Sequence, residues 1–354
     1  MKKVDVIVPY YVPPFLGGTE TVLRDWDEWF GNDNGMTKVR FIVPFKQRGS
    51  YIFKSKKSNH VVAPSFFTKE GFVKALGMLF LVAHLFLTKT DEIVVLSPKY
   101  IKLAKLVQRV AHKKYRVISW MHFSLNSMFT DQTSAFLQAD AHLAISTGIE
   151  RQLISMGVND TTIFPIYNPV SKKNRIIETA TKPVFIFVGR LESLNQKNVT
   201  ELIKGFALVH KSNADAELRI IGDGADRHVL EDLVHSLCLE NHVEFLGWKR
   251  SPFEELKQAT ALVLTSTFEG LPMVLLESIS FGLPVVSSDI QTGPADIVNP
   301  ENGLLYQLGD IEMLARQMLN VYDEQLDRIA VQNSINQFYA QQYFKNVDLI
   351  LEDL

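Results

Sequence analysis

Residues 261–286, ALVLTSTFEGLPMVLLESISFGLPVV, contain a strand, a helix and a second strand in close succession. The apolar run Ala261–Leu264 predicts a buried strand, and Pro272 suits the first turn of the helix that follows. Gly282 ends that helix before the next apolar run, Pro284–Val286. Strands joined through a helix in this way form a βαβ unit, which predicts a parallel sheet.

The same alternation extends over the whole chain. In the first half the expected strands are Val4–Pro9, Val39–Val43, Glu92–Leu96, Arg116–Ser119, Ala141–Ile145 and Thr162–Ile166. In the second half they are Val184–Val188, Glu217–Ile221, Val243–Phe245, Ala261–Leu264 and Pro284–Val286. The polar stretch 168–175, which contains a proline, separates the two series. The sequence therefore predicts an α/β protein with two doubly wound, Rossmann-like domains.

We expect an N-terminal domain at 1–168, a C-terminal domain at 169–335 and a last helix at 336–354. That helix either covers the second domain or crosses back to the first. The chain has 354 residues, 46% of them hydrophobic and 21% charged, which fits two globular domains and excludes disorder. The one cysteine, Cys238, excludes a disulfide framework and suggests a reducing compartment. Its apolar-periodic surroundings predict a buried thiol.

Charge is distributed unevenly. Residues 1–170 contain 21 Lys and Arg against 13 Asp and Glu, which leaves 16 against 26 for the remainder of a chain with net charge −2. A basic first half suits an anionic acceptor or an anionic membrane surface. Because the basic residues are scattered, a merely solvated face is the alternative, and no nucleic-acid partner is expected. The apolar run Ala75–Leu87 is too short to span a bilayer. We interpret it as a buried helix, with a position against a membrane surface as the alternative.

No signal peptide is expected, because the first apolar run is short and ends at Pro9. A cytoplasmic protein, either free or peripheral on the inner face of the membrane, is the expectation.

In open α/β sheets ligands bind at the carboxyl ends of the strands, so the residues there are the candidates for a site. In the first half these include Gly17 and Gly18 before a helix, and His122 after a strand. We interpret Asp25-Trp26-Asp27, within a helix, as a solvated face.

Two turns of the second half carry glycine. Gly189 and Arg190 follow one strand, and Lys197 comes shortly before the next helix. Two cations at such a turn suit a phosphate or a diphosphate. Gly222-Asp223-Gly224 forms half of a dinucleotide fingerprint, but Arg227 stands in place of its third glycine. A dinucleotide site is therefore disfavoured.

The most informative loop runs from Ser266 to Glu277. Gly270, Leu271, Pro272 and Met273 are expected to place free backbone N–H groups at a helix N-terminus, which favours an anion. Glu269 precedes these residues, and Glu277 lies further along the helix. Carboxylates bind vicinal hydroxyls well, so the pair could hold a sugar and a ribose on either side of a diphosphate.

In combination and order, these motifs resemble the retaining glycosyltransferases of family 4, which have the two-domain GT-B fold. The resemblance rests on Gly189-Arg190-Leu191 with Lys197, on Ile221-Gly222-Asp223-Gly224, and on Glu269 and Glu277 with seven residues between them. Further stretches resemble the lipopolysaccharide core α-1,6-galactosyltransferase branch. They are Ser119–Leu125, Ala144–Ile149, Tyr167–Val170, Ser287–Asp289 and Gly293-Pro294. The stretch of about residues 50–89 has no counterpart, which leaves the acceptor open.

The resemblance implies a role for each candidate. Arg190 and Lys197 would neutralise the donor diphosphate, Glu269 would hold the donor sugar and Glu277 the ribose. Backbone N–H groups of Gly270–Met273 would contact sugar and phosphate. His122 would hydrogen-bond the sugar near its 6-position. The remaining donor-binding candidates are Gly17, Gly18, Gly189, Gly222, Gly247, Trp248 and Lys249, the last three of them facing the nucleotide base.

The expected function is that of a retaining hexosyltransferase, which uses a UDP-hexose, galactose before glucose, and a glycan or lipid-linked acceptor in cell-surface polysaccharide synthesis. No cofactor and no essential metal ion are expected, because two cations and a helix N-terminus could replace much of what a metal supplies. The alternatives are a UDP-sugar epimerase on the same fold and a non-catalytic partner subunit. An oxidoreductase is the weakest alternative, because Arg227 breaks the dinucleotide fingerprint.

Overall fold

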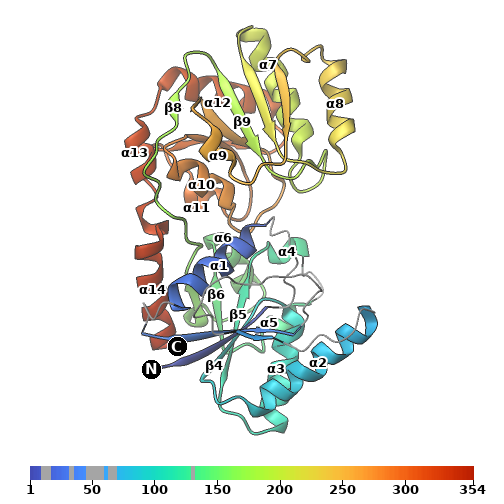
Figure 1. Ribbon diagram of the computed structural model, residues 1–354, viewed down its shortest axis with the longest axis vertical. Coiled ribbons are helices and arrows are strands. Elements are labelled where there is room, and N and C mark those ends of the chain that lie inside the picture. Colours follow the sequence, from blue (N-terminus) through green and yellow to red (C-terminus); the bar gives the residue numbers. More distant parts are fainter. Residues whose placement is uncertain (9–16, 32–35, 45–59, 63–69, 129–131) are drawn as a thin grey trace. The chain divides into compact units, whose positions relative to one another are not determined.

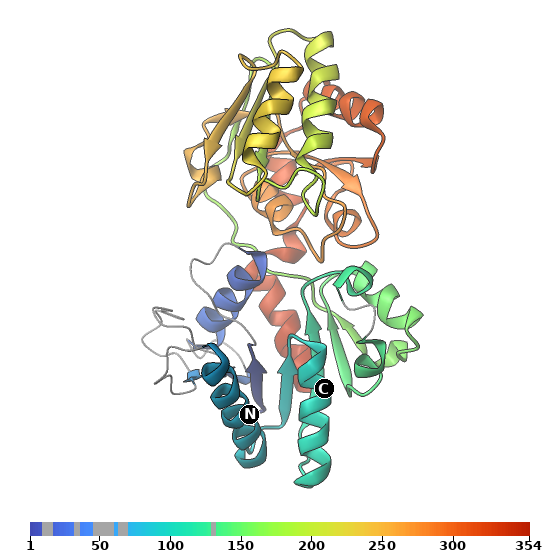
Figure 2. The same ribbon diagram turned by 90° about the vertical axis from the view of Figure 1, so that its right-hand side faces the viewer.

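The computed structural model describes residues 1–8, 17–31, 36–44, 60–62, 70–128 and 132–354. The chain folds into two compact units, each built around a parallel sheet with helices on its faces (Figure 1, Figure 2). The first unit combines Met1–Pro169 with Ala340–Leu354, and the second comprises Val170–Tyr339. The last helix therefore belongs to the first unit, although it follows the second along the chain.

The first sheet has the strand order β3-β2-β1-β4-β5-β6-β7. Its strands are β1 Lys3–Ile7, β2 Lys38–Val43, β3 His60–Val62, β4 Glu92–Val95, β5 Arg116–Met121, β6 Ala141–Ala144 and β7 Ile163–Pro165. The α-helices of this unit are α1 Gly18–Gly31, α2 Glu70–Leu87, α3 Pro98–Val110, α4 Leu125–Met128, α5 Thr133–Phe136, α6 Thr147–Ser155 and α14 Ala340–Asp353. The strand order reverses between β1 and β4, which is the position where doubly wound sheets open for a ligand.

The second sheet repeats this plan, with the order β11-β10-β9-β13-β14-β15. Its strands are β9 Val184–Val188, β10 Glu217–Ile221, β11 Val243–Gly247, β13 Ala261–Leu264, β14 Val285–Asp289 and β15 Gly303–Gln307, and β8 Glu178–Thr179 pairs with β12 Gln258–Ala259. The α-helices are α7 Val199–Ser212, α8 Arg227–Ser236, α9 Pro252–Glu255, α10 Met273–Ser280, α11 Pro294–Ile297, α12 Ile311–Glu324 and α13 Arg328–Asn333. Here the order reverses between β9 and β13.

The predicted pair of doubly wound parallel sheets is confirmed. Strands β9, β10 and β13 have the predicted bounds. The other predicted strands begin or end at different residues, and Pro9, the predicted end of the first strand, lies outside the described residues. Strands β3, β8, β12 and β15 were not predicted. Each pairs with a single neighbouring strand, so this pairing defines them more than their own sequence does.

Helix α14 packs on α1 through aromatic side chains. The rings of Trp29 and Phe344 stack with centroids 4.8 Å apart, and the buried Trp26 Nε1 donates a hydrogen bond to the Tyr343 hydroxyl at 3.0 Å. Asp348 accepts hydrogen bonds from backbone N–H groups at the start of the β2 segment. Fully buried aromatic side chains contribute much of the stability of such a contact. The end of the chain is thus part of the core of the first unit.

Replacing Tyr343 by phenylalanine should lower the free energy of unfolding of the first unit by about 1–3 kcal/mol. The substitution keeps the ring but removes the acceptor, which leaves the buried Trp26 N–H unpaired. Urea unfolding followed by tryptophan fluorescence measures the change. Tyr322→Phe is the matched control, because that exposed hydroxyl donates only to the Thr181 carbonyl at the surface. Equal unfolding midpoints for the two variants would contradict the assigned role of the Tyr343 hydroxyl.

Three interpretations of local patterns were wrong. Cys238 is exposed, because α8 ends at Ser236 and the chain turns away through Cys238 with a φ of 56°. Trp26 and Asp27 are buried rather than solvated, and for Trp26 the reason is that α14 packs on α1 at this side chain. The outer face of α2 is exposed, although the run Ala75–Leu87 was interpreted as a buried helix. Among the described residues no helix is long and apolar enough to cross a bilayer.

Candidate active site

The turns after β9 and β10 lie against each other. A Cβ atom on Gly222 would lie 1.8 Å from the carbonyl oxygen of Gly189, and one on Gly224 would lie 2.4 Å from that of Leu191. Because real Cβ atoms do not approach so closely, both positions require glycine. The half fingerprint predicted at Gly222 therefore has a packing reason, since it lets the turn after β10 support the turn after β9.

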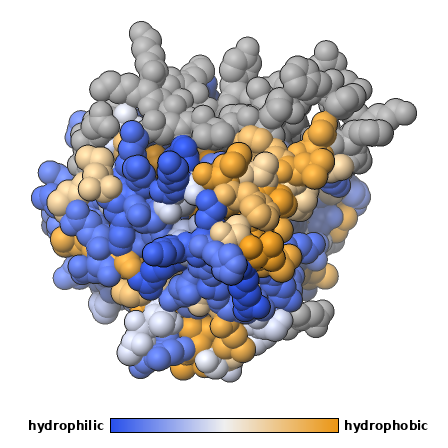
Figure 3. All heavy atoms as spheres, turned by 90° about the horizontal axis from the view of Figure 1, so that it is seen from below, coloured by the Kyte–Doolittle hydropathy of each residue, from blue (hydrophilic) through white to orange (hydrophobic). Residues whose placement is uncertain are grey.

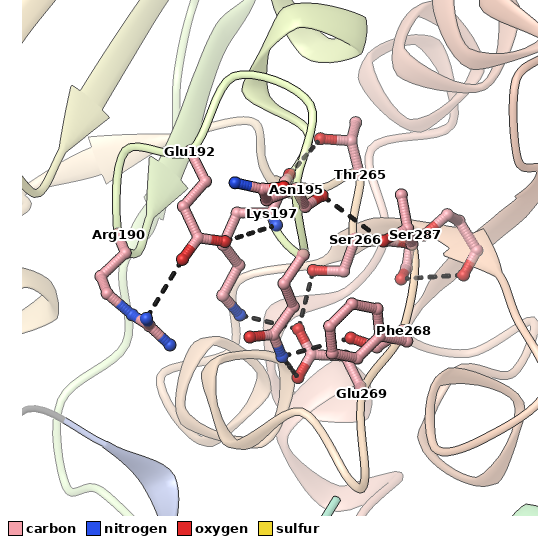
Figure 4. A network of polar contacts seen from close by, with 12 residues as sticks. Arg190, Glu192, Asn195, Lys197, Thr265, Ser266, Phe268, Glu269 and Ser287 are labelled. Carbon is pink, nitrogen blue, oxygen red and sulfur yellow. Dashed lines mark hydrogen bonds and ion pairs between the residues drawn. The ribbon is translucent and has the colours of Figure 1, made fainter. Parts of the chain in front are cut away.

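Glu269 is the centre of a polar network at the carboxyl end of β13 (Figure 4). Its Oε1 accepts hydrogen bonds from Lys197 Nζ at 2.7 Å and from Ser266 Oγ at 2.7 Å, and its Oε2 accepts one from Gln196 Nε2 at 3.2 Å. The residue is 7% exposed. Both carboxylate oxygens are thus held in place while remaining lone pairs stay available to a ligand. The structure brings together Lys197 and Glu269, two of the predicted catalytic residues.

Arg190 lies on the loop between β9 and α7, as Lys197 does, but apart from the Glu269 network. Its guanidinium pairs with Glu192 at 3.1 Å, and its side chain is 64% exposed. The other oxygen of Glu192 accepts a hydrogen bond from the backbone N–H of Lys197, and Thr265 Oγ1 donates to the Lys197 carbonyl (Figure 4). These bonds fix the loop between β9 and α7. Arg190 does not touch Glu269, so it is available for a ligand group other than the one that Glu269 contacts.

Helix α10 begins directly after this network. Gly270, Leu271 and Pro272 are buried, and the helix starts at Met273, one residue later than predicted. The first N–H groups of a helix have no partners within the helix, and the helix dipole adds partial positive charge there. Glu277 is half-buried on the same helix. The loop and helix therefore present a carboxylate, a helix N-terminus and a second carboxylate in sequence.

The turn after β11 presents an aromatic ring. Gly247 ends β11 with a φ of 68°, and its carbonyl accepts a hydrogen bond from the Gly222 N–H at 2.9 Å. Trp248 follows and is 56% exposed, and Lys249 pairs with Glu255. An exposed indole beside a strand end is a surface on which a flat base can stack.

In the first unit, His122 lies directly after β5. It is 8% exposed, and its ring centroid lies 4.5 Å from that of Trp120. The Trp120 ring in turn packs against Trp26, with centroids 4.3 Å apart. Burial lowers the pKa of His122 to about 3, so the imidazole is neutral at physiological pH. Its buried Nε2 has no hydrogen-bond partner among the described residues. A ligand hydroxyl would satisfy that nitrogen.

The glycine pair of the first unit lies at the start of α1. Gly18 is the first residue of the helix, and the Gly17 carbonyl accepts a hydrogen bond from Thr21. A Cβ atom on Gly17 would lie 2.5 Å from the Glu20 carboxylate, a flexible group that could move aside. Packing alone therefore does not explain this glycine, in contrast to Gly222.

The candidates thus divide between the units. His122, Gly17 and Gly18 belong to the first, and the remaining site residues belong to the second. Sequence reasoning missed Glu192, Gln196 and Ser266, which hold the predicted residues. Ser266 follows β13, and Gln196 lies next to Lys197 in the loop after β9. Because ligands bind at the carboxyl ends of such strands, both residues could have been named as candidates from the sequence.

Two buried histidines should make the first unit acid-sensitive. Burial lowers the pKa of His122 to about 3 and that of His142 to about 4, below the ordinary value of 6.5. The folded protein then binds fewer protons than the unfolded chain below pH 6.5. The stability that these groups contribute is complete above that pH and is lost as the pH falls. At pH 5 the expected loss is about 2 kcal/mol per histidine.

Urea unfolding at a series of pH values tests this expectation. His122→Gln should flatten the decrease below pH 6.5, whereas His235→Gln, at a side chain 82% exposed, should leave it unchanged. A wild-type stability that stays constant between pH 7 and pH 5 would contradict the assigned neutrality of the two histidines.

Comparison with known proteins identifies the family. Residues 171–337 match the glycosyl transferases group 1. The lipopolysaccharide 1,6-galactosyltransferase of Salmonella typhimurium is 32% identical over 343 residues, 94% of each chain, and that of Escherichia coli K12 is 37% identical over 249 residues, 66% of this chain and 67% of the relative. The apo structure of the lipopolysaccharide outer core galactosyltransferase WaaB superposes with a TM-score of 0.84 at 30% identity, with 100% of both chains covered.

A structure of Anabaena Alr3699/HepE, solved with UDP and glucose, shows the same fold with a TM-score of 0.76 at 18% identity and full coverage of both chains. The family match in the second unit and the full-length relatives agree with the resemblance inferred from the motifs. The chain is therefore a hexosyltransferase with the GT-B fold and belongs to the group 1 glycosyl transferases.

Proposed function

We propose that this enzyme transfers galactose from UDP-galactose to a lipid-linked glycan of a cell-surface polysaccharide, on the cytoplasmic side of the membrane. Transfer proceeds with retention of configuration and without an essential metal ion. The names of the two lipopolysaccharide galactosyltransferases support the sugar and the acceptor class. The observation that most supports a sugar-nucleotide site is the Glu269 carboxylate, held by Lys197, Ser266 and Gln196 at the switch point of the second sheet.

The cations act on the leaving group. Negative charge grows on the donor diphosphate as its bond to the sugar breaks, and preorganised positive charge stabilises that state. Lys197, Arg190 and the N-terminus of α10 supply this charge, with charge-assisted hydrogen bonds worth about 1.5–3 kcal/mol each. Their combined contribution takes the place of a divalent cation. Glu269 accepts hydrogen bonds from the sugar hydroxyls, which orients the reacting carbon.

The rest of the donor extends along the same strand ends. Glu277 accepts hydrogen bonds from the ribose hydroxyls, and the backbone of Gly270–Met273 donates to sugar and phosphate. The turn of Gly247, Trp248 and Lys249 contacts the base. Gly189 and Gly222 let the backbone turns approach the donor.

The remaining proposed roles belong to residues of the first unit. His122 is neutral because of its burial, so its imidazole acts as a hydrogen-bond donor or acceptor to the sugar near its 6-position rather than as a cation. Gly17 and Gly18 leave room for phosphate and acceptor. The acceptor oxygen bonds to the anomeric carbon on the face from which the diphosphate departs. Its proton passes to the departing phosphate oxygen.

Release of UDP from a panel of UDP-sugars tests the proposal, with and without a glycolipid acceptor and with and without EDTA. We expect release from UDP-galactose to exceed that from the other donors at least about tenfold, because one misplaced hydroxyl leaves a buried polar group unpaired. Acceptor should raise the rate, and EDTA should leave it unchanged. Loss of activity in EDTA that Mg²⁺ restores would contradict metal independence. A new sugar nucleotide formed without acceptor would indicate an epimerase, and inactivity with every donor would indicate a partner subunit.

A further inference from the structure

Helix α2 is apolar on two opposite faces. Its inner face contains Leu81 and Leu85, which are fully buried against the first unit. Its outer face presents two pairs of exposed side chains, seven to eight residues or about two helical turns apart: Met78 at 39% and Leu79 at 66%, then Phe86 at 40% and Leu87 at 78%. Side chains at this spacing form one continuous stripe along a helix. Such stripes normally pack against a core, yet this one faces outward.

The stripe continues onto α3, which packs beside α2. There Leu106 is 59% exposed and Val110 is 62% exposed. Figure 3 views the molecule from below, from the end near α2 and α3 in Figure 1, and shows an apolar area with hydrophilic residues beside it. We call the six exposed apolar residues of the two helices the outer face: Met78, Leu79, Phe86, Leu87, Leu106 and Val110. Large exposed apolar patches with a polar rim mark sites of association.

The surroundings of the outer face are positively charged. Between Gly71 and Val110 the acidic residues are Asp91 and Glu92 alone. Asp91 accepts a hydrogen bond from the Lys3 N–H, and Glu92 is buried beside Lys2. The basic residues of the same stretch are Lys74, Lys89, Lys99, Lys102 and Arg109, besides Lys105, whose charge is paired with Asp140 at 2.9 Å. Apolar side chains with basic neighbours suit a bilayer that contains anionic lipids.

Polar contacts with β1 and β2 hold the C-terminal end of helix α2 on the first sheet. The buried Asp5 carboxylate accepts two hydrogen bonds from Arg40 at 2.8 and 2.9 Å, one from Thr88 at 2.9 Å, and contacts His84 Nε2 at 2.8 Å. Burial alone would raise the pKa of Asp5, but the hydrogen bonds from His84 and Arg40 keep it below its usual value. The outer face is therefore carried by a helix that the sheet holds in place.

We propose that the outer face of α2 and α3 docks on a membrane surface rich in anionic lipid. The proposal rests on the proposed function, because a lipid-linked acceptor lies in such a surface. A second copy of the chain fits less well. A symmetric dimer would bring the same patch of each chain together, and the basic residues around it would then face one another.

Flotation with phosphatidylcholine vesicles, with and without phosphatidylglycerol, tests this proposal in the absence of donor and acceptor. The wild type should bind the anionic vesicles, and added salt should weaken the binding. Leu79→Glu with Phe86→Glu should reduce it at least about tenfold, because two apolar side chains no longer enter the bilayer. Lys102→Gln should reduce it about fivefold. The matched control is Val229→Glu with Ile329→Glu, at side chains of the second unit that are 45% and 54% exposed.

Two results would overturn the proposal. One is equal vesicle binding by the outer-face variant and its control. The other is a concentration-dependent dimer of the wild type that the outer-face variant dissociates, without vesicle binding by either protein. UDP release with a detergent-dispersed acceptor tests the proposed function separately, and the outer-face variant should retain it. An unchanged urea unfolding midpoint verifies that the variant folds.

Discussion

Replacing Glu269 by alanine is expected to lower kcat/KM for UDP-galactose at least about a hundredfold. The change removes the acceptor for the sugar hydroxyls and also leaves Lys197 and Ser266 without their shared partner at 2.7 Å. Glu269→Gln should retain part of the activity, because its amide oxygen still accepts hydrogen bonds. Initial rates of UDP release at saturating acceptor measure both variants.

Glu231→Ala is the control for this prediction. That carboxylate pairs with Arg227 on the exposed surface of α8, in the same unit as Glu269 but outside the polar network. It should leave kcat/KM unchanged. Activity of Glu269→Ala within a few-fold of wild type would remove Glu269 from the site, provided that its urea unfolding midpoint shows a folded protein.

Lys197→Ala is expected to reduce kcat about a hundredfold and to weaken UDP binding. Lys197 supplies a cation to the diphosphate and also balances the buried Glu269 carboxylate, so its loss affects the leaving group and the sugar contact together. Lys197→Arg should restore little, because the Lys197 side chain is only 15% exposed and a planar guanidinium cannot reproduce the contact of its compact ammonium with Glu269.

Calorimetric UDP titration and single-turnover rates separate the two effects of Lys197. Lys204→Ala is the control, because that lysine is exposed on α7, the helix that begins shortly after Lys197. A Lys197→Ala protein with unchanged UDP affinity and a normal rate would mean that the diphosphate is neutralised elsewhere. Arg190→Ala would then be the decisive variant.

Local patterns predicted the second unit best. The strand Ala261–Leu264 and the helix after Pro272 follow from an apolar run, a glycine loop and a proline, all within a few residues of one another. Glu269 and Lys197 were found because they follow strands. Their contact was not predictable from the sequence, because 72 residues separate them and only the pairing of β9 with β13 brings their loops together.

Long-range packing explains the wrong interpretations. Trp26 was assigned to a solvated face, and nothing near it in the sequence indicates that Tyr343, 317 residues later, covers it. For the run Ala75–Leu87, composition alone was not enough to predict its surroundings. Its composition indicates association with apolar surroundings but does not distinguish a core from a bilayer. The exposed fractions of Leu79 and Leu87 show that these side chains lie outside the core of the first unit.

The position of α14 has a consequence for how the protein is made on the ribosome. The second unit is one continuous stretch, Val170–Tyr339, and can complete its fold as soon as it leaves the exit tunnel. The first unit emerges earlier but keeps Trp26 and Trp29 uncovered until Ala340–Leu354 has been synthesised. The N-terminal half of the nascent chain is therefore finished last. A stop codon shortly before residue 340 would damage the unit encoded at the start of the gene.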